Sequence, residues 1–368
     1  MQGLTPEGLL AVMAGTRATL DECRRMVAEV VQRGRSDLRQ VRNVRADVRD
    51  EAERRAPAGA MTVRSRVSSA EDPFVKFALA CGDGAVVETV RIPLERAGRY
   101  VVCVSSQVGC AMGCAFCATG EMGLTRNLEA WEIVEQVRVV AQELRETGEG
   151  RVHGVVFQGM GEPLHNLDNV LAALEVMREP CGLAIDARNV TVCTVGIVPG
   201  IERLTALGTR ARLAISVTSA RSALRRRLVP MEGRYPIVEV LAAARKFHAR
   251  SGRLVMLAYA MLGGVNTDPE EAQALATLLD GMPARLSLIE YNPVPGQPWR
   301  RPTEEERTVF HDALARLGVP VVRRYSGGQD IGAACGQLAT ETGRARRRPA
   351  PGSQGLEAPA DMDATQDS

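Results

Sequence analysis

Hydrophobic and polar residues follow two alternating patterns from about residue 100 to residue 335. Short apolar runs rich in β-branched residues alternate with stretches in which apolar residues recur every three or four positions. The runs typical of strands are "YVVCV", "GVVFQG", "NVTVCTV", "RLAISV", "LVMLAYAM" and "RLSLIEY", and the stretches typical of helices are 129–145, 167–178, 200–207, 236–250, 269–280 and 303–317. Repeated strand–helix units predict a parallel sheet, either doubly wound or closed into a barrel.

Small and polar residues interrupt this pattern in a way that favours the barrel. Each interruption falls just after the C-terminal end of a predicted strand, where the functional groups of (β/α) barrels lie. The interruptions are a cysteine-rich loop, "GMGEP", "CTVG", "SVTS" and "YNPVPG". The sequence therefore predicts an α/β barrel over residues 99–340, with its site at the strand ends.

Three further segments lie outside the barrel pattern. Residues 1–55 are predicted to form a small helical accessory domain, with Thr5 and Pro6 at the start of its first helix. Residues 56–98 are predicted to be a β-rich connecting segment. Residues 341–368 are rich in proline, arginine and acidic residues without apolar periodicity, which predicts a disordered tail.

Composition and charge restrict the partners only slightly. The net charge of +2 does not demand a nucleic-acid partner, and the basic residues are almost all arginine, with Lys76 and Lys246 as the only lysines. The mixed arginine and acidic residues before residue 55 favour a solvated helical face over an RNA-binding face. No apolar run reaches about 18 residues and no signal pattern opens the chain, so we expect a cytoplasmic protein without a membrane partner.

Three of the nine cysteines, Cys110, Cys114 and Cys117, fall within one loop. A structural zinc site normally has four protein ligands in two separated pairs, and no second pair follows here. Three thiolates suit a [4Fe–4S] cluster with one iron left open to bind a cofactor or substrate. The spacing, with Phe116 before the third cysteine, is the signature of the radical S-adenosylmethionine (SAM) superfamily, although zinc or coincidence stays open at this point.

The motif "GMGEP" meets a requirement of that hypothesis. A SAM molecule chelating the open iron needs protein groups to hold its amino group and ribose. Gly161 allows close backbone approach, and Glu162 offers a carboxylate at a strand end. The alternative is a simple turn that contains a charged residue.

Six motifs together are similar to one family. They are "CVSSQVGCAMGCAFC", "GMGEPLHN", "VTVCTVGIVPGI", "RLVPMEGRYPI", "YNPVPGQPWRRP" and "DIGAACGQL", spread from about Glu88 to Leu338. The chain resembles the radical-SAM RNA adenine methyltransferases, the RlmN/Cfr family. The resemblance implies a partial (β/α) barrel of the radical-SAM type, a [4Fe–4S] cluster and SAM. It also implies methylation of adenine carbon-2 or carbon-8 in 23S ribosomal RNA, and possibly tRNA, with an electron donor such as flavodoxin or ferredoxin.

The resemblance also implies roles for residues outside the cluster loop. Cys335 matches the cysteine that carries the methyl group and forms a covalent bond to RNA. Cys103 matches the cysteine that resolves this adduct and leaves a disulfide. Glu88 matches the proposed proton acceptor, with a solvated edge carboxylate as the alternative. The implied SAM contacts are Gly161, Glu162, Cys193, Ser216, Val217, Thr218 and Asn292.

Some positions depart from the family pattern. Cys193 stands where the family has a serine, and the segment that begins at Ser216 lacks the family histidine. These departures leave a radical-SAM enzyme acting on a peptide or small molecule as one alternative. A non-enzymatic iron–sulfur or zinc RNA-binding protein is the other. Cys103 and Cys335 together argue against the first alternative.

Replacing any one of Cys110, Cys114 and Cys117 by alanine is expected to abolish iron binding and SAM cleavage together. The reason is that two thiolates do not hold the cluster as three do. Iron content and SAM cleavage, measured on anaerobically purified variants, test this expectation. Retained iron and full cleavage in one variant would contradict the cluster assignment.

Overall fold

The computed structural model describes residues 1–35, 37–323 and 326–339. The predicted disordered tail, 341–368, lies outside the described residues.

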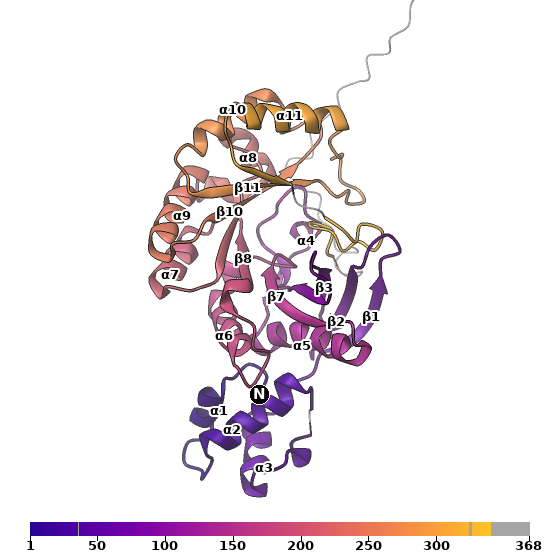
Figure 1. Ribbon diagram of the computed structural model, residues 1–368, viewed down its shortest axis with the longest axis vertical. Helices are drawn as coiled ribbons and strands as arrows, with labels where there is room; N and C mark the ends of the chain where they lie inside the picture. The colour runs from indigo at the N-terminus through magenta and orange to yellow at the C-terminus, as the bar shows by residue number, and fades with distance from the viewer. Residues whose placement is uncertain (36, 324–325, 340–368) are drawn as a thin grey trace, which may run out of the picture.

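A single ten-stranded sheet forms the centre of the molecule (Figure 1). Its parallel part consists of β4 (Arg99–Cys103), β7 (Arg151–Phe157), β8 (Val190–Thr194), β9 (Arg212–Ser216), β10 (Val255–Met261), β11 (Ala284–Glu290) and β12 (Val321–Arg323), in that spatial order. Within the described ranges, β12 has no strand on its outer edge, so the sheet stays open. The predicted α/β fold with a partial barrel is confirmed.

Six helices connect or follow the parallel strands, close to the predicted ranges. They are α5 (Ala130–Thr147), α6 (Leu167–Arg178), α7 (Val198–Leu207), α9 (Ile237–Ser251), α10 (Pro269–Leu278) and α11 (Glu304–Arg316). Local sequence sets their ends: Gly148 ends α5 in the left-handed conformation, and Thr303 with Glu306 forms a capping box at α11. Figure 1 shows these helices along the outer side of the curved sheet.

The residues predicted as a connecting segment extend this same sheet. They form β1 (Thr62–Ser68), β2 (Val75–Ala80) and β3 (Val86–Pro93), which pair antiparallel with one another and then with β4. The outermost strand, β1, is exposed along its whole length. The antiparallel strands place Glu88 of β3 near the first parallel strand, on which Cys103 lies.

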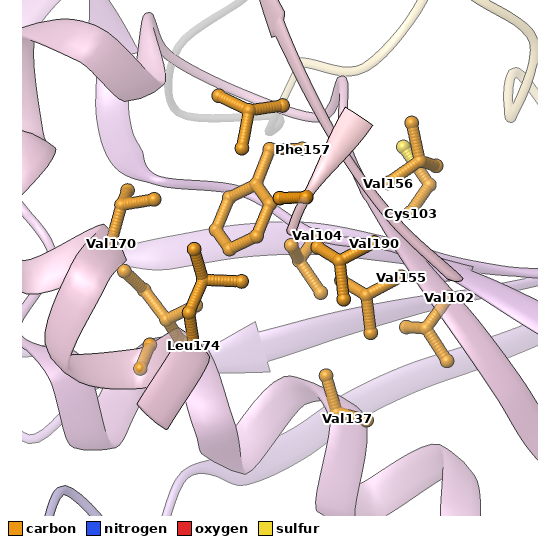
Figure 2. Close-up of a cluster of buried hydrophobic side chains, with 14 of the residues drawn as sticks. Val102, Cys103, Val104, Val137, Val155, Val156, Phe157, Val170, Leu174 and Val190 are labelled. Atoms are coloured by element: carbon orange, nitrogen blue, oxygen red, sulfur yellow. The ribbon is translucent and has the colours of Figure 1, made fainter. Parts of the chain in front are cut away.

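Along the first two parallel strands, β4 and β7, successive side chains point alternately toward the core and toward the site. Val102 of β4 is paired in register with Val155 of β7, and Cys103 with Val156. Figure 2 shows Val102 and Val155 on the side that faces Val137 of α5, whereas Cys103 and Val156 project to the opposite side. Because successive side chains point to opposite faces, burying the valines against the helices turns the Cys103 thiol away from them.

The N-terminal residues form α1 (Pro6–Val12), α2 (Leu20–Val27) and α3 (Ala46–Arg55). The predicted cap is confirmed, since the Thr5 side chain accepts a hydrogen bond from the Gly8 amide at 3.1 Å. The helix α2 is regular only to Val27 and continues as a π-helical turn over Ala28–Gln32. Buried residues of this region belong to the same hydrophobic cluster as the sheet. Among the helices of the described residues, none combines the length and apolarity needed to cross a bilayer.

A buried ion pair fixes the ends of two central strands. Arg225 of α8 (Ser222–Leu228) pairs with Glu232, and both side chains are almost completely buried. The Arg225 guanidinium also donates to the Val217 carbonyl at 3.0 Å and to the Val195 carbonyl at 2.8 Å. These carbonyls follow β9 and β8, so one side chain holds both strand ends.

Replacing Arg225 by methionine is expected to lower the free energy of unfolding by about 3–5 kcal/mol, because Glu232 is left buried without its cation. Arg226→Met, on the exposed side of the same helix, is the matched control and should cost less than about 0.5 kcal/mol. Urea denaturation of both variants measures the difference. Equal losses would show that Arg225 does not have this structural role.

Candidate active site

A cavity of about 160 Å³ lies at the C-terminal ends of the parallel strands. Its walls come from the loops after β4 and β7 and from the last residues of β8, β9, β10 and β11. The residues predicted from the sequence that line it are Cys110, Cys114, Cys117, Gly161, Glu162, Cys193, Ser216, Asn292 and Cys335. Candidate ligands from six separate parts of the sequence thus meet in one place, as expected for strand ends of a barrel.

The cysteine loop is held in place by backbone contacts to distant segments. The Ala115 amide donates to the Leu228 carbonyl at 2.9 Å, and the Ala118 amide donates to the Gly336 carbonyl at 2.8 Å. The indole of Trp299 donates to the Ala115 carbonyl at 2.8 Å. These contacts fix the shape of the loop.

The electrostatics of the loop suit a cationic group. Burial raises the pKa of the Cys110 thiol to about 12, and it also raises the pKa values of Cys114 and Cys117. Buried thiolates require a compensating positive charge, which the irons of a cluster supply. In a cluster each cysteine binds a different iron, so the three thiols fit that group chemically.

Glu162 is a buried carboxylate in the wall of the cavity. Burial raises its pKa to about 7. Its two oxygens accept hydrogen bonds from the amides of Leu164 at 3.0 Å and Val195 at 2.9 Å. Gly161 has a φ of +98°, and a Cβ there would lie 2.6 Å from the Cβ of Gln107, so the motif requires glycine at this position. The arrangement can pair with a ligand ammonium group.

The last residue of β9, Ser216, and the two residues that follow it do not share one environment. Ser216 lines the cavity, whereas Val217 and Thr218 are buried and absent from its lining. The Thr218 carbonyl accepts from the Asn266 side chain at 2.7 Å. SAM contacts from Val217 and Thr218 stay predictions.

Asn292, just after β11, connects the cavity to the loop that carries Cys335. Its side-chain amide donates to the Cys335 carbonyl and to the Ser326 hydroxyl, both at 3.0 Å. Its other polar atom, Oδ1, is buried without a hydrogen-bond partner among the described residues. A buried acceptor of this kind fits a polar ligand in the cavity.

A second cavity, of about 60 Å³, brings Cys103 and Cys335 together although 232 positions separate them in the sequence. Cys335 and Gln158 line this cavity and the larger one. The half-buried residue Cys335 therefore lies between the cluster loop and Cys103. All nine cysteines are free thiols in this structure, so the disulfide implied by the resemblance is not formed.

Glu88 lies outside the lining of both cavities, on β3. Its Oε1 lies 3.0 Å from Lys76 Nζ, and its Oε2 accepts from the Ala339 amide at 2.8 Å. Glu88 is buried, so the alternative of a solvated edge carboxylate is wrong. Its role as a proton acceptor stays a prediction.

Sequence reasoning missed the small residues that leave room for the cavity. Ala258 and Ala260 of β10 line it, while Leu257 and Tyr259 of the same strand are fully buried on the other face. The alternation of small and large residues in "VMLAYAM" was the signal that could have found this wall. Lys76 was also missed, because nothing nearby in the sequence predicts its contacts.

Comparison with known proteins defines the class. The sequence profile of the Radical SAM superfamily matches residues 104–276, which contain the cysteine loop and the strands from β7 to β10. A crystal structure of a radical SAM methyltransferase from Sphaerobacter thermophilus matches with a TM-score of 0.86 at 37% sequence identity, covering 92% of this chain and 98% of that one. Fold and site together define a radical-SAM enzyme.

Relatives narrow the class to one family. A probable RNA methyltransferase of Sorangium cellulosum (strain So ce56) is 48% identical over 352 residues, covering 89% of this chain and 90% of that protein. The dual-specificity RNA methyltransferase RlmN of Anaeromyxobacter dehalogenans (strain 2CP-C) is 39% identical over 349 residues, covering 93% and 92%. The chain belongs to this family of radical-SAM RNA methyltransferases, which confirms the resemblance inferred from its motifs.

Ala258→Leu is expected to weaken SAM binding at least about tenfold, because the added carbons enter a cavity of only about 160 Å³. The melting temperature should change little, since the side chain faces open space and not the packed core. Met256→Leu, on the same face of β10 but outside the cavity lining, is the control. Equilibrium dialysis with labelled SAM compares the two variants, and equal affinities would place SAM elsewhere.

Proposed function

We propose that this enzyme methylates a ring carbon of adenine, C2 or C8, in RNA through methylated Cys335 and a covalent protein–RNA intermediate. The observation that carries the proposal is the shared cavity of Cys103 and Cys335, directly beside the cavity that contains the cluster cysteines. The relatives named as RNA methyltransferases support RNA as the substrate. We take 23S ribosomal RNA as the first candidate and tRNA as the second, in a cytoplasmic enzyme.

The chain offers a defined place for each cofactor. Cys110, Cys114 and Cys117 would hold the [4Fe–4S] cluster, and the wall formed by Glu162, Ser216 and Asn292 would hold SAM. When bound, these groups supply a methyl group and the one-electron chemistry that removes a hydrogen atom from an unactivated carbon. A reducing partner such as flavodoxin or ferredoxin would deliver the electron.

Cys335 has the position that a methyl carrier needs. An adenine ring carbon is a poor nucleophile, so the methyl group is first placed on the sulfur of Cys335, a residue that lines the cofactor cavity. Cys335 also lines the smaller cavity, together with Cys103. Once the carbon is bonded to the base, the Cys103 thiolate attacks the Cys335 sulfur. The sulfur–carbon bond breaks, a disulfide forms, and the carbon keeps the electron pair and takes a proton.

Glu88 is the candidate proton acceptor for the adenine ring proton. Both of its oxygens are engaged, one with Lys76 and one with the Ala339 amide. Each oxygen makes one of these contacts and has a second lone pair, so it can accept a proton without losing that contact.

The N-terminal arginines contribute to the domain itself. Arg33 and Arg35 pair with Glu29, and Arg25 donates to the Asn43 carbonyl at 2.6 Å. These contacts support the interpretation of a solvated structural face.

A radical-SAM enzyme acting on a peptide or small molecule is the alternative. The residue changes at Cys193 and Ser216–Ser219 favour it, because they alter the walls expected to contact cofactor and substrate. Mass spectrometry of adenosines in ribosomal RNA and tRNA, from cells with and without the gene, distinguishes the two. Loss of a methyladenosine in the deletion strain supports the RNA substrate, and identical nucleoside profiles contradict it.

Cys103→Ala and Cys335→Ala are expected to fail at different steps. Cys335→Ala lacks the methyl carrier and should leave both protein and RNA unmodified. Cys103→Ala should still form the covalent bond to the base but cannot break it, so a nuclease-sensitive adduct should accumulate on denaturing gels. Cys81→Ala, a buried cysteine outside both cavities, is the control. Absence of the adduct, under conditions where wild type turns over, would refute the mechanism.

A further inference from the structure

The loop that carries Cys335 has no helix or strand of its own over residues 326–339. On its barrel side it is held by Asn292 and by the Ala118 amide. On its other side it lies against the start of β2 and the turn before it, and Figure 1 shows the yellow loop beside β1 and β2. The position of the Cys335 thiol therefore depends on contacts with segments far away in the sequence.

The turn between β1 and β2 makes two of these contacts. The Gly328 amide donates to Asp72 Oδ2 at 2.8 Å, and the Ala70 amide donates to Asp330 Oδ2 at 2.8 Å. Gly328 has a φ of +71°, and a Cβ there would lie 3.2 Å from the Cβ of Phe74. The two segments approach each other too closely for a side chain at this position.

Lys76 and Glu88 make the other two contacts, one on each side of Cys335. Lys76 Nζ donates to the Gly332 carbonyl at 3.3 Å and lies 3.0 Å from Glu88 Oε1. Glu88 Oε2 accepts from the Ala339 amide at 2.8 Å. The side chains of Lys76 and Glu88 are 13% and 7% exposed, so these charge-assisted contacts are shielded from water.

The presence of lysine and not arginine at position 76 indicates how much space the cation has. The chain has 46 lysines and arginines, of which only Lys76 and Lys246 are lysines, and Lys246 is exposed. A lysine ammonium is a compact charge with three donors, whereas the planar guanidinium of arginine needs more space and a fixed orientation. The narrow position between a carboxylate and a backbone carbonyl fits the ammonium.

We propose that Lys76, acting through Glu88 and Gly332, is a positioning residue that keeps Cys335 between the cofactor cavity and Cys103. This inference rests on the proposed function, in which the Cys335 sulfur must serve both sides in turn. The four contacts of the loop with Ala70, Asp72, Lys76 and Glu88 form a clamp, and the β1–β2 hairpin carries three of these four residues. If Lys76 only neutralised the charge of Glu88, its contact with the Gly332 carbonyl would not be needed. The two contacts between the β1–β2 turn and the loop would not be needed either.

Hydrogen–deuterium exchange of the anaerobically purified holoenzyme tests the clamp without using activity. In Lys76→Met, the amides of residues 326–339 are expected to exchange at least about tenfold faster, with the amides of β8, β9 and β10 unchanged. Lys246→Met is the matched control and should exchange like wild type. Unchanged exchange in the loop, or an equal acceleration throughout the molecule, would overturn the inference.

Two further variants keep the test decisive if Lys76→Met folds poorly. Asp330→Ala removes one clamp contact at an exposed position, and should accelerate exchange of the loop about fivefold with the melting temperature unchanged. Asp186→Ala removes a half-buried aspartate whose side chain accepts hydrogen bonds from Arg188, and serves as its control. Lys76→Arg keeps the charge and should restore global stability but not loop protection. Full protection in both Asp330→Ala and Lys76→Arg would overturn the inference.

A second readout separates this inference from the proposed function. In a Cys103→Ala background, Lys76→Met should reduce the yield of the protein–RNA adduct at least about tenfold, while Lys246→Met should not. If Cys103→Ala alone gives no adduct, the proposed function fails, and the exchange experiment still decides whether the clamp exists. If the adduct forms equally with Lys76→Met, the clamp has no role in positioning Cys335.

Discussion

The parallel alignment of the central strands is the constraint on which the rest of this structure depends. Each parallel connection requires a crossover, here through helices that cover the outer side of the sheet. The parallel strands β4, β7, β8, β9, β10 and β11 therefore end at the same edge. Residues as distant as Cys110, Cys193 and Asn292 meet there because of the topology, without any local signal that joins them.

At that edge the strands end, and their backbone groups lose the hydrogen-bond partners of the sheet. Buried polar side chains replace some of these partners. Arg225 donates to carbonyls after β8 and β9, and Glu162 accepts from an amide after β8. Since unpaired buried polar groups are costly, these side chains stabilise the fold and at the same time fix the shape of the cavity. Structural and functional roles are therefore joined in the same residues.

Sequence pattern predicted the regular elements and the cluster loop well, for a physical reason. Periods of 2 and 3.6 residues report burial of one face, which is a local property, and the spacing of Cys110, Cys114 and Cys117 is also local. Short elements carry too little pattern, so α8, β12 and the hairpin of β5 (Gln107–Cys110) with β6 (Gly123–Asn127) were not predicted. The partner of Glu88 was missed because its contact with Lys76 depends on the register of β2 and β3, and that with Ala339 spans 251 positions.

The clamp around Cys335 also has a consequence for the order of folding. Its contacts join residues separated by 251 to 260 positions, so loop closure over most of the chain precedes them. Contacts of such high sequence separation form late in folding, after the local strand–helix units. The β1–β2 hairpin is synthesised early, long before the last strand of the sheet. The reactive thiol is thus brought to the cofactor cavity only when the remainder of the catalytic scaffold is already complete.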